Sequence, residues 1–228
     1  MLYGENQVRD NIRNRNGKRV FFLGPEDQLK SDARDYLRRE RIEILPAREA
    51  RPDQYAVLGG GFYPEKPKHM THLNGDFLVR KDHPRILFRG KMDSLQADLL
   101  LAVKYCPESR EDLEEILKFS HGLLAAEVLE KPVETEKLCG LEEKQIRSMS
   151  HFPQNTFGIP HFMPSGGDCE EILYLNRARC AAREAELYAV RAFTDPEGRP
   201  VREDLLRALN RMSSMLYILM IKRKAVTG

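Results

Sequence analysis

Residues 166–222, GGDCEEILYLNRARCAAREAELYAVRAFTDPEGRPVREDLLRALNRMSSMLYILMIK, contain two long helical patterns separated by the turn DPEG at 195–198. On the first helix Arg179, Arg183 and Glu186 stand at i, i+4 and i+7, which places them on one face. Ile172 and Ala182 lie beside them, so the charges occupy a position where a buried face is expected. Charged groups there need a partner or a ligand.

A polar cluster interrupts the second helical pattern. Asn210 follows Leu209, and Ser213 and Ser214 come one turn later inside an otherwise apolar run. Buried polar groups are costly unless they form hydrogen bonds. Both helices therefore predict polar groups that meet a partner or a ligand.

The composition is that of a globular protein without a polyelectrolyte partner. Of 228 residues, 41% are hydrophobic and 32% charged, and 37 basic against 35 acidic residues leave a net charge of +2. This length allows one well-packed domain and a smaller second unit. The small net charge gives no electrostatic reason to expect nucleic acid or an anionic membrane, so an anion site must be local.

The cysteines and histidines predict no metal site. The four cysteines are far apart and form no C-x-x-C pair: Cys106, Cys139, Cys169 and Cys180. Together with the absence of a signal peptide at the N-terminus, this predicts free thiols in a reducing cytosol. His69 and His72 form H-x-x-H near His83, but no thiolate or carboxylate stands at ligand spacing. No apolar run approaches the roughly 18 residues of a membrane span.

The helical patterns predict a mainly α fold, a five-helix bundle with a small N-terminal strand-helix-strand module. The bundle helices are expected over about 85–105, 110–129 and 141–149, with two more within 166–222. In the N-terminal module we expect strands at 19–23 and 42–45 and a helix at 31–41.

Three segments follow from this pattern. Residues 1–45 are the predicted α/β module, 46–68 a linker or ordered lid, and 69–228 the helical-bundle domain. The middle segment contains four prolines and the run Gly59-Gly60-Gly61, which disfavour a regular element. Residues 69–84 suit an extended loop whose cations could hold a phosphate.

Asp93 places a carboxylate on the apolar stripe of the first bundle helix. Its neighbours at i−7, i+4 and i+7 are Ile86, Ala97 and Leu100. Burial without a partner would cost several kcal/mol, so an arginine should face it, either within the chain or from another subunit.

Five blocks in order carry a family resemblance: KPKHMTHL (66–73), LVRKDHPRILFRGKMDSLQA (78–97), HFMPSGG (161–167), RARCAAREAE (177–186) and ALNRMSSMLYILMI (208–221). They resemble the ATP-dependent corrinoid adenosyltransferases, in particular the ethanolamine-utilisation branch, and more distantly the propanediol-utilisation branch. The N-terminal stretch SDARDYLRRERIEIL (31–45) is also similar to a segment of ethanolamine-utilisation proteins.

The resemblance implies an enzyme that transfers the 5′-deoxyadenosyl group of ATP to cob(I)alamin, with Mg²⁺ assisting the triphosphate. It implies a homo-oligomer, trimeric in the better-known branch, with ATP and the corrinoid bound between subunits. It also implies a cytoplasmic place, or one inside a bacterial microcompartment, with a reductase and microcompartment proteins as partners. Attack in line at a carbon needs no general base, so cations and amides should dominate the site.

The site residues that the resemblance implies form three groups. The ATP-binding residues are Thr71, Lys81, Arg183, Glu186 and Asn210, the catalytic residues are Arg179, Arg183 and Asp93, and the corrinoid-binding residue is Phe162. Asp93 matches an aspartate that pairs with an arginine of the neighbouring subunit. Phe162 is the candidate apolar side chain that displaces an axial cobalt ligand so that Co(II) can be reduced; packing of its loop on the bundle is the alternative.

Two alternatives stay open at this point. Alignment on PSGG without a gap would select Arg177 and Glu184, although the shared helical face favours Arg179, Arg183 and Glu186. In function, a non-catalytic corrinoid carrier, or an adaptor that docks to microcompartment partners through residues 1–45, is the second hypothesis. An adaptor would not need the cations, the carboxylates and Asn210.

Overall fold

The computed structural model describes residues 2–15, 17–24, 26–46, 55–63, 65–74, 77–133 and 137–227. The chain divides into two compact units, one ending at Lys81 and the other beginning at Asp82. The described residues are mainly helical, with small sheets, as the sequence predicts. None of the helices described is both long enough and apolar enough to cross a membrane.

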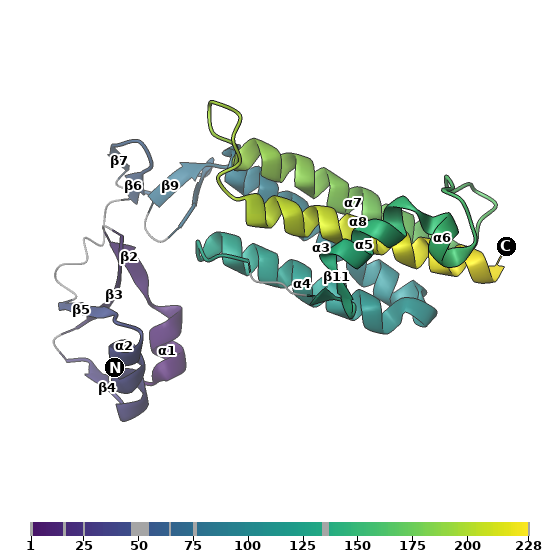
Figure 1. Cartoon of the computed structure of the whole chain (residues 1–228). Helices are drawn as coiled ribbons and strands as arrows, with labels where there is room; N and C mark the ends of the chain where they lie inside the picture. The colour runs from purple at the N-terminus through teal and green to yellow at the C-terminus, as the bar shows by residue number, and fades with distance from the viewer. Residues whose placement is uncertain are drawn as a thin grey trace. The chain divides into compact units, whose positions relative to one another are not determined.

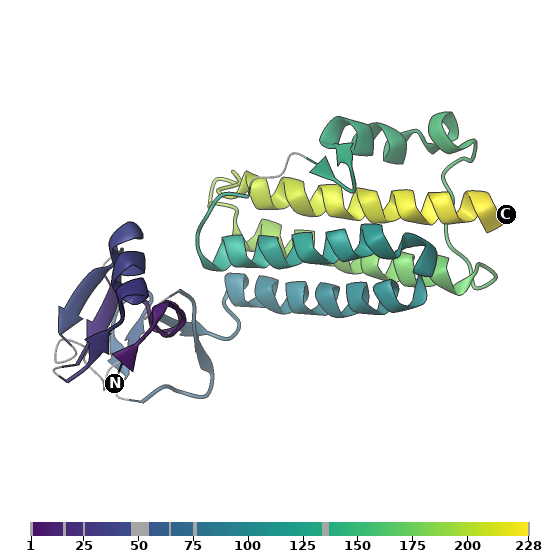
Figure 2. The same ribbon diagram turned by 90° about the horizontal axis from the view of Figure 1, so that it is seen from below.

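The C-terminal unit consists of helices that lie side by side (Figures 1 and 2). Its elements are α3 (Pro84–Tyr105), the 3-10 helix η2 (Pro107–Ser109), α4 (Arg110–Val128), β10 (Lys137–Leu138), β11 (Leu141–Glu142), α5 (Glu143–His151), α6 (Pro153–Phe157), α7 (Glu170–Ala192) and α8 (Glu203–Thr227). Helix α7 packs against α3 and α8, α4 packs against α3, and α5 packs along α8. The long helices match the predicted ranges to within a few residues at most ends.

Side-chain size explains how these helices pack. Helix α8 is buried almost all round, including Leu205, Leu209 and Met212, so it lies at the centre of the unit. Helix α7 faces its neighbours with alanines such as Ala178 and Ala182, which are fully buried. Small side chains let helix axes approach closely.

The start of α3 is fixed by local chemistry. Pro84 occupies the first turn, where its missing N–H is tolerated, and His83 Nδ1 accepts the N–H of Arg85 at 3.3 Å. Burial and then the positive charges of Arg85 and Arg89 lower the pKa of His83, so the imidazole stays a neutral acceptor near the neutral pH range.

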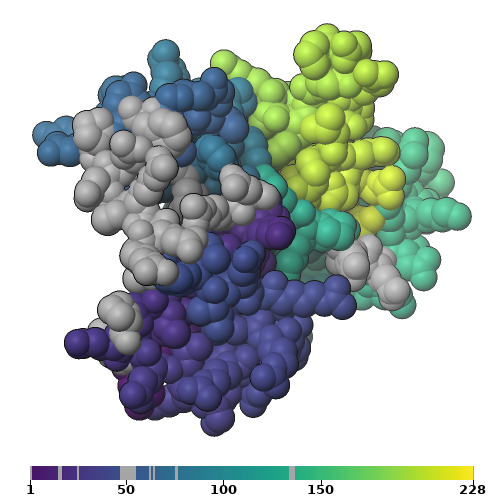
Figure 3. All heavy atoms as spheres, turned by 90° about the vertical axis from the view of Figure 1, so that its left-hand side faces the viewer, coloured from purple at the N-terminus to yellow at the C-terminus, as the bar shows by residue number. Residues whose placement is uncertain are grey.

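The described residues of the N-terminal unit form short strands and two helices. Its elements are β1 (Leu2–Tyr3), α1 (Glu5–Asp10), β2 (Arg13–Arg15), β3 (Lys18–Leu23), β4 (Gln28–Leu29), α2 (Ser31–Arg39), β5 (Glu43–Pro46), β6 (Tyr55–Val57), β7 (Phe62–Tyr63), β8 (Met70–His72) and β9 (Phe77–Arg80). The predicted strand-helix-strand is present as β3, α2 and β5, with β3 and β5 parallel. Phe21, Ala33 and Leu37 contribute to its small core. The purple and dark-blue atoms of this part gather in one mass (Figure 3).

The segment predicted as a linker and an extended loop contains a second sheet. Its strands follow the order β7-β6-β9-β8, and the β8 and β9 strands pair antiparallel, with Thr71 opposite Val79. Met70, Leu78 and Val79 are buried, and the successive residues Leu78 and Val79 point to opposite faces of the sheet. Residues 47–54 and 64, within the predicted linker, lie outside the described residues. The first compact unit ends at Lys81, whereas the sequence predicted that the bundle domain begins at His69.

Candidate active site

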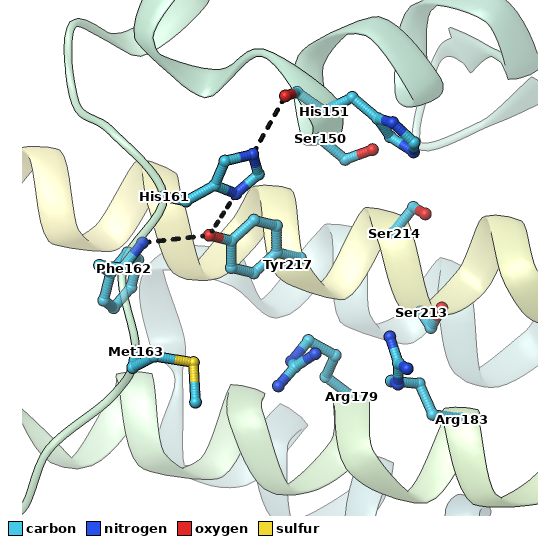
Figure 4. Close-up of a pocket in the computed structure, with 10 residues that line it drawn as sticks. All are labelled: Ser150, His151, His161, Phe162, Met163, Arg179, Arg183, Ser213, Ser214 and Tyr217. Atoms are coloured by element: carbon cyan, nitrogen blue, oxygen red, sulfur yellow. Dashed lines mark hydrogen bonds between the residues drawn. The ribbon is translucent and has the colours of Figure 1, made fainter.

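A cavity of about 430 Å³ lies between α5, α7, α8 and the loop that joins α6 to α7. The residues that line it are Ser150, His151, His161, Phe162, Met163, Arg179, Arg183, Ser213, Ser214 and Tyr217 (Figure 4). No carboxylate occurs among these lining residues, whereas rings and a thioether form an apolar wall. The cavity therefore suits a ligand with an anionic part and a large apolar part.

Arg179 and Arg183 extend from α7 toward α8 on one side of the cavity (Figure 4). The half-buried Arg179 donates from Nε and Nη2 to Asn176 Oδ1 at 3.2 and 3.0 Å and lies 5.8 Å from the ring centroid of Tyr217. Arg183 is exposed, and no hydrogen bond or ion pair joins its guanidinium to another described residue. Because arginine is always charged, the pair offers two positive charges to an anion.

The sequence predicted that the charged residues of α7 lie on its buried face, and this prediction was wrong. The fully buried stripe consists of alanines, among them Ala178, Ala182 and Ala185. Arg179, Arg183 and Glu186 each follow one of these alanines in sequence. Alanine brings α7 close to its neighbours, so the next residue along reaches the rim of the cavity.

A second, smaller cavity of about 260 Å³ adjoins the first and shares His151 and Ser214 with it. Its lining includes Asn210, whose Nδ2 donates to Glu186 Oε1 at 3.3 Å. Glu186 and Asn210, predicted from separate helices, are thus brought together next to the arginine pair.

Asp93 lies away from both cavities. It is exposed on α3, and no hydrogen bond or ion pair links it to another residue among those described. The buried stripe of α3 runs through Met92, Leu95 and Leu99 instead. The prediction that Asp93 lies on a buried stripe within this chain was therefore wrong, because the apolar residues Ala97 and Leu100 on its face are themselves exposed. An ion pair inside the core of this chain is excluded.

Comparison with known proteins adds a family to this geometry. The model of the cobalamin adenosyltransferase family matches residues 63–223. The chain belongs to this family. The corrinoid adenosyltransferase EutT of Salmonella typhimurium is 28% identical over 204 residues, covering 89% of this chain and 76% of that protein. EutT of Escherichia coli K12 is 30% identical over the same shares.

More distant members match a smaller part. The corrinoid adenosyltransferase PduO of Salmonella typhimurium is 32% identical over 152 residues, 62% of this chain and 43% of that protein. A solved variant of the PduO-type enzyme from Lactobacillus reuteri, complexed with cobalamin and ATP, is 16% identical with a TM-score of 0.49, covering 77% of this chain and 89% of that one.

The two alignments of this adenosyltransferase chain with its family select different residues of α7, and the structure places these residues differently. Arg179 and Arg183 line the cavity, whereas Arg177 pairs with Asp98 at 2.6 Å and Glu184 pairs with Lys91 at 2.7 Å. Arg177 and Glu184 are thus engaged with α3 and do not line either cavity.

Thr71 and Lys81, predicted to bind phosphate, belong to the N-terminal unit. Thr71 lies on β8, and Lys81 follows β9, where its N–H donates to the His69 carbonyl oxygen at 2.9 Å. The Lys81 side chain is exposed.

Among the lining residues that sequence reasoning did not single out are His151, His161 and Tyr217. Tyr217 could have been found, because it stands at i+7 from Asn210 and shares a helical face with it and with Ser214. His161 and His151 approach α8 through loop geometry and tertiary packing, which no residue spacing encodes.

Proposed function

We propose that this member of the cobalamin adenosyltransferase family transfers the 5′-deoxyadenosyl group of ATP to cob(I)alamin, as expected of an ethanolamine-utilisation enzyme. The observation that carries this proposal is the cavity in which Arg179 and Arg183 face an apolar wall without a carboxylate among the lining residues. In the reaction a cobalt–carbon bond forms at C5′, the C5′–O bond breaks, and triphosphate leaves with the electron pair.

The arginines have the main chemical task. Negative charge accumulates on the leaving triphosphate, so positive charges beside it stabilise the transition state more than the ground state. Arg183, which has no described protein partner, and Arg179, held by Asn176, supply these charges. Glu186 and Asn210, joined by their hydrogen bond, position the nucleoside part of ATP.

Four further residues belong to this proposal. Thr71 and Lys81 bind the phosphates, with Mg²⁺ neutralising part of their charge. Phe162 contacts the corrinoid and displaces an axial ligand of cobalt before reduction. Asp93 pairs with an arginine of a neighbouring subunit, in a five-helix bundle that assembles with its ligands between subunits.

Exposure of the α3 surface supports this assembly. Leu100, one heptad from Asp93 on the same face, is 57% exposed. An exposed leucine next to a carboxylate suits a contact in which an apolar surface and one ion pair are buried together. A monomeric mass in solution would contradict this part of the proposal.

The decisive experiment mixes the protein with ATP and chemically reduced cobalamin under strict anaerobiosis and follows the spectrum of adenosylcobalamin and the release of triphosphate. We expect both products in equal amounts. Binding of cobalamin without either product would instead favour the corrinoid carrier. Retention by microcompartment proteins through residues 1–45 alone would favour the adaptor.

A further inference from the structure

The loop between α6 and α7 carries Phe162 along α8 and has little structure of its own. Among the described residues, no backbone-to-backbone hydrogen bond holds residues 159–164. The N–H of Phe162 instead donates to the side-chain hydroxyl of Tyr217 on α8, at 3.3 Å. One oxygen atom therefore fixes the loop backbone at the residue that faces the corrinoid in the proposed function.

His161 extends this contact to a second element. Its Nδ1 lies 3.0 Å from the Tyr217 hydroxyl, and its Nε2 lies 3.0 Å from the carbonyl oxygen of His151 at the end of α5. A carbonyl oxygen only accepts, so Nε2 carries the proton and Nδ1 accepts the hydroxyl proton of Tyr217. The hydroxyl then accepts the Phe162 N–H, and every donor in the chain of bonds has an acceptor.

Ring contacts support the same arrangement. The imidazole of His161 stacks on the Tyr217 ring with centroids 5.7 Å apart and an interplanar angle of 11°. The Phe162 ring lies 6.2 Å from the same ring at 25°. Figure 4 shows His161 between the His151 carbonyl and Tyr217, with Phe162 on the same side of α8.

A second contact holds the other end of the loop. Lys224, seven residues after Tyr217 on α8, donates to Asp168 Oδ1 at 2.8 Å, and Asp168 also accepts the N–H of Ser165 at 2.7 Å. The Lys224 ammonium lies 5.9 Å from the Phe162 ring centroid. The Phe162 ring is thus held from two points one heptad apart on a single helix.

We propose that Tyr217 and His161 are positioning residues that fix Phe162 at the corrinoid side of the cavity. The proposal rests on the proposed function, in which Phe162 displaces an axial ligand of Co(II). Their hydrogen bonds hold the loop in one conformation, so the Phe162 ring reaches the cobalt without an ordering cost at the time of reduction. Tyr217 acts through Phe162 and does not itself take part in the transfer of the adenosyl group.

The test compares Tyr217→Phe with a matched control, Tyr174→Phe. The first substitution keeps the ring and removes the hydroxyl; the second removes a hydroxyl of α7 that no described residue binds, from a ring stacked on Tyr105. With cob(II)alamin, ATP and a one-electron reductant, we expect Tyr217→Phe to slow adenosylation about tenfold, since two hydrogen bonds are lost. With pre-reduced cob(I)alamin the loss should be less than about twofold, because only weak contacts change.

Amide hydrogen exchange gives a readout that is independent of activity. In Tyr217→Phe, and in the second variant His161→Gln, exchange of the Phe162 amide should be faster than in the wild type, while exchange in α3 and α8 stays unchanged. Equal losses of activity in the two assays, or unchanged exchange in both variants, would overturn the proposal. Failure of the wild type to adenosylate cob(I)alamin would overturn the proposed function, and the exchange measurement would still decide whether the hydroxyl holds the loop.

Discussion

Two pairs of arginines have the same spacing on their helices and opposite surroundings. Arg85 and Arg89 of α3 both reach Glu127 of α4, whose side chain is fully buried, with Nε to carboxylate oxygen distances of 2.5 and 2.6 Å. Arg179 and Arg183 of α7 face a cavity without a carboxylate among its lining residues. The difference shows that arginines at i and i+4 can neutralise buried acids or face a cavity, depending on which acids pack around them.

The first pair forms a closed electrostatic unit. Glu127 accepts from Arg85 and Arg89 with Oε1 and from Arg89 again with Oε2. Glu130 binds Nη1 of Arg85 at 2.9 Å, so two cations meet two anions. Arg85 Nη2 also donates to the backbone carbonyl of Glu127 at 3.1 Å. All these contacts lie within the chain, which leaves little capacity for a ligand. Arg179 and Arg183, by contrast, have no carboxylate among the residues around their cavity and can still bind an anion.

Glu127→Gln is expected to have the largest effect on stability of the substitutions that test this comparison. Removing one partner of a buried charge cluster typically costs about 3–5 kcal/mol, because the remaining charges stay buried without compensation. We expect a loss of unfolding free energy of this size, measured by urea denaturation. The matched control is Glu184→Gln, which breaks the exposed pair with Lys91 and should cost less than about 1 kcal/mol. Similar losses in the two variants would show that the buried cluster is not a special source of stability.

Arg183→Ala tests the pair that faces the cavity, Arg179 and Arg183. Loss of one preformed charge from a transition-state site typically reduces turnover about 100- to 1000-fold, or about 2.7–4 kcal/mol. We expect that loss in adenosylation of cob(I)alamin, with a change of less than about 0.5 kcal/mol in unfolding free energy, because the side chain is exposed and has no described partner. Arg191→Ala, an exposed arginine of the same helix outside both cavities, is the control. A loss of stability equal to that of Glu127→Gln would remove the distinction between the pairs.

The sequence alone could predict the helices but not this distinction. The long helices are legible because their apolar residues recur with the helical period over many turns. Strands of two to four residues such as β6 and β8 carry too little periodicity to be read, so that part of the chain was predicted as linker and loop. The R-x-x-x-R pattern occurs on both α3 and α7, and only packing against Glu127, 38 residues after Arg89, separates the two cases.

Part of the candidate site could also be predicted from the sequence, where helical spacing determines which side chains meet. Helical spacing placed Glu186 and Asn210 on faces that were expected to meet, and their side chains are in contact. Asp93 was predicted as buried because apolar neighbours were read as core, although a helix of this protein also has apolar residues on an exposed face. The contact of His161 with Tyr217 joins residues 56 positions apart through an irregular loop, and no periodic pattern encodes it.

Arg202 and Asp204 form a smaller ion pair within the chain, and its contribution to stability depends on pH. The hydrogen bonds of Arg202 to Asp204, together with the N–H of Val133 at 2.9 Å, lower the pKa of Asp204 to about 2. The unfolded carboxyl titrates at its ordinary, higher pKa, so this stabilisation is complete above about pH 4 and is lost as the pH falls toward 2.

Asp204→Asn should therefore cost about 1–2 kcal/mol of unfolding free energy at pH 7. Denaturation of both proteins should show the difference shrinking between pH 4 and 2, whereas the exposed control Glu203→Gln should show little change at either pH. A difference that is independent of pH would mean that the hydrogen-bond geometry, and not the charge of Asp204, stabilises this junction between α4 and α8.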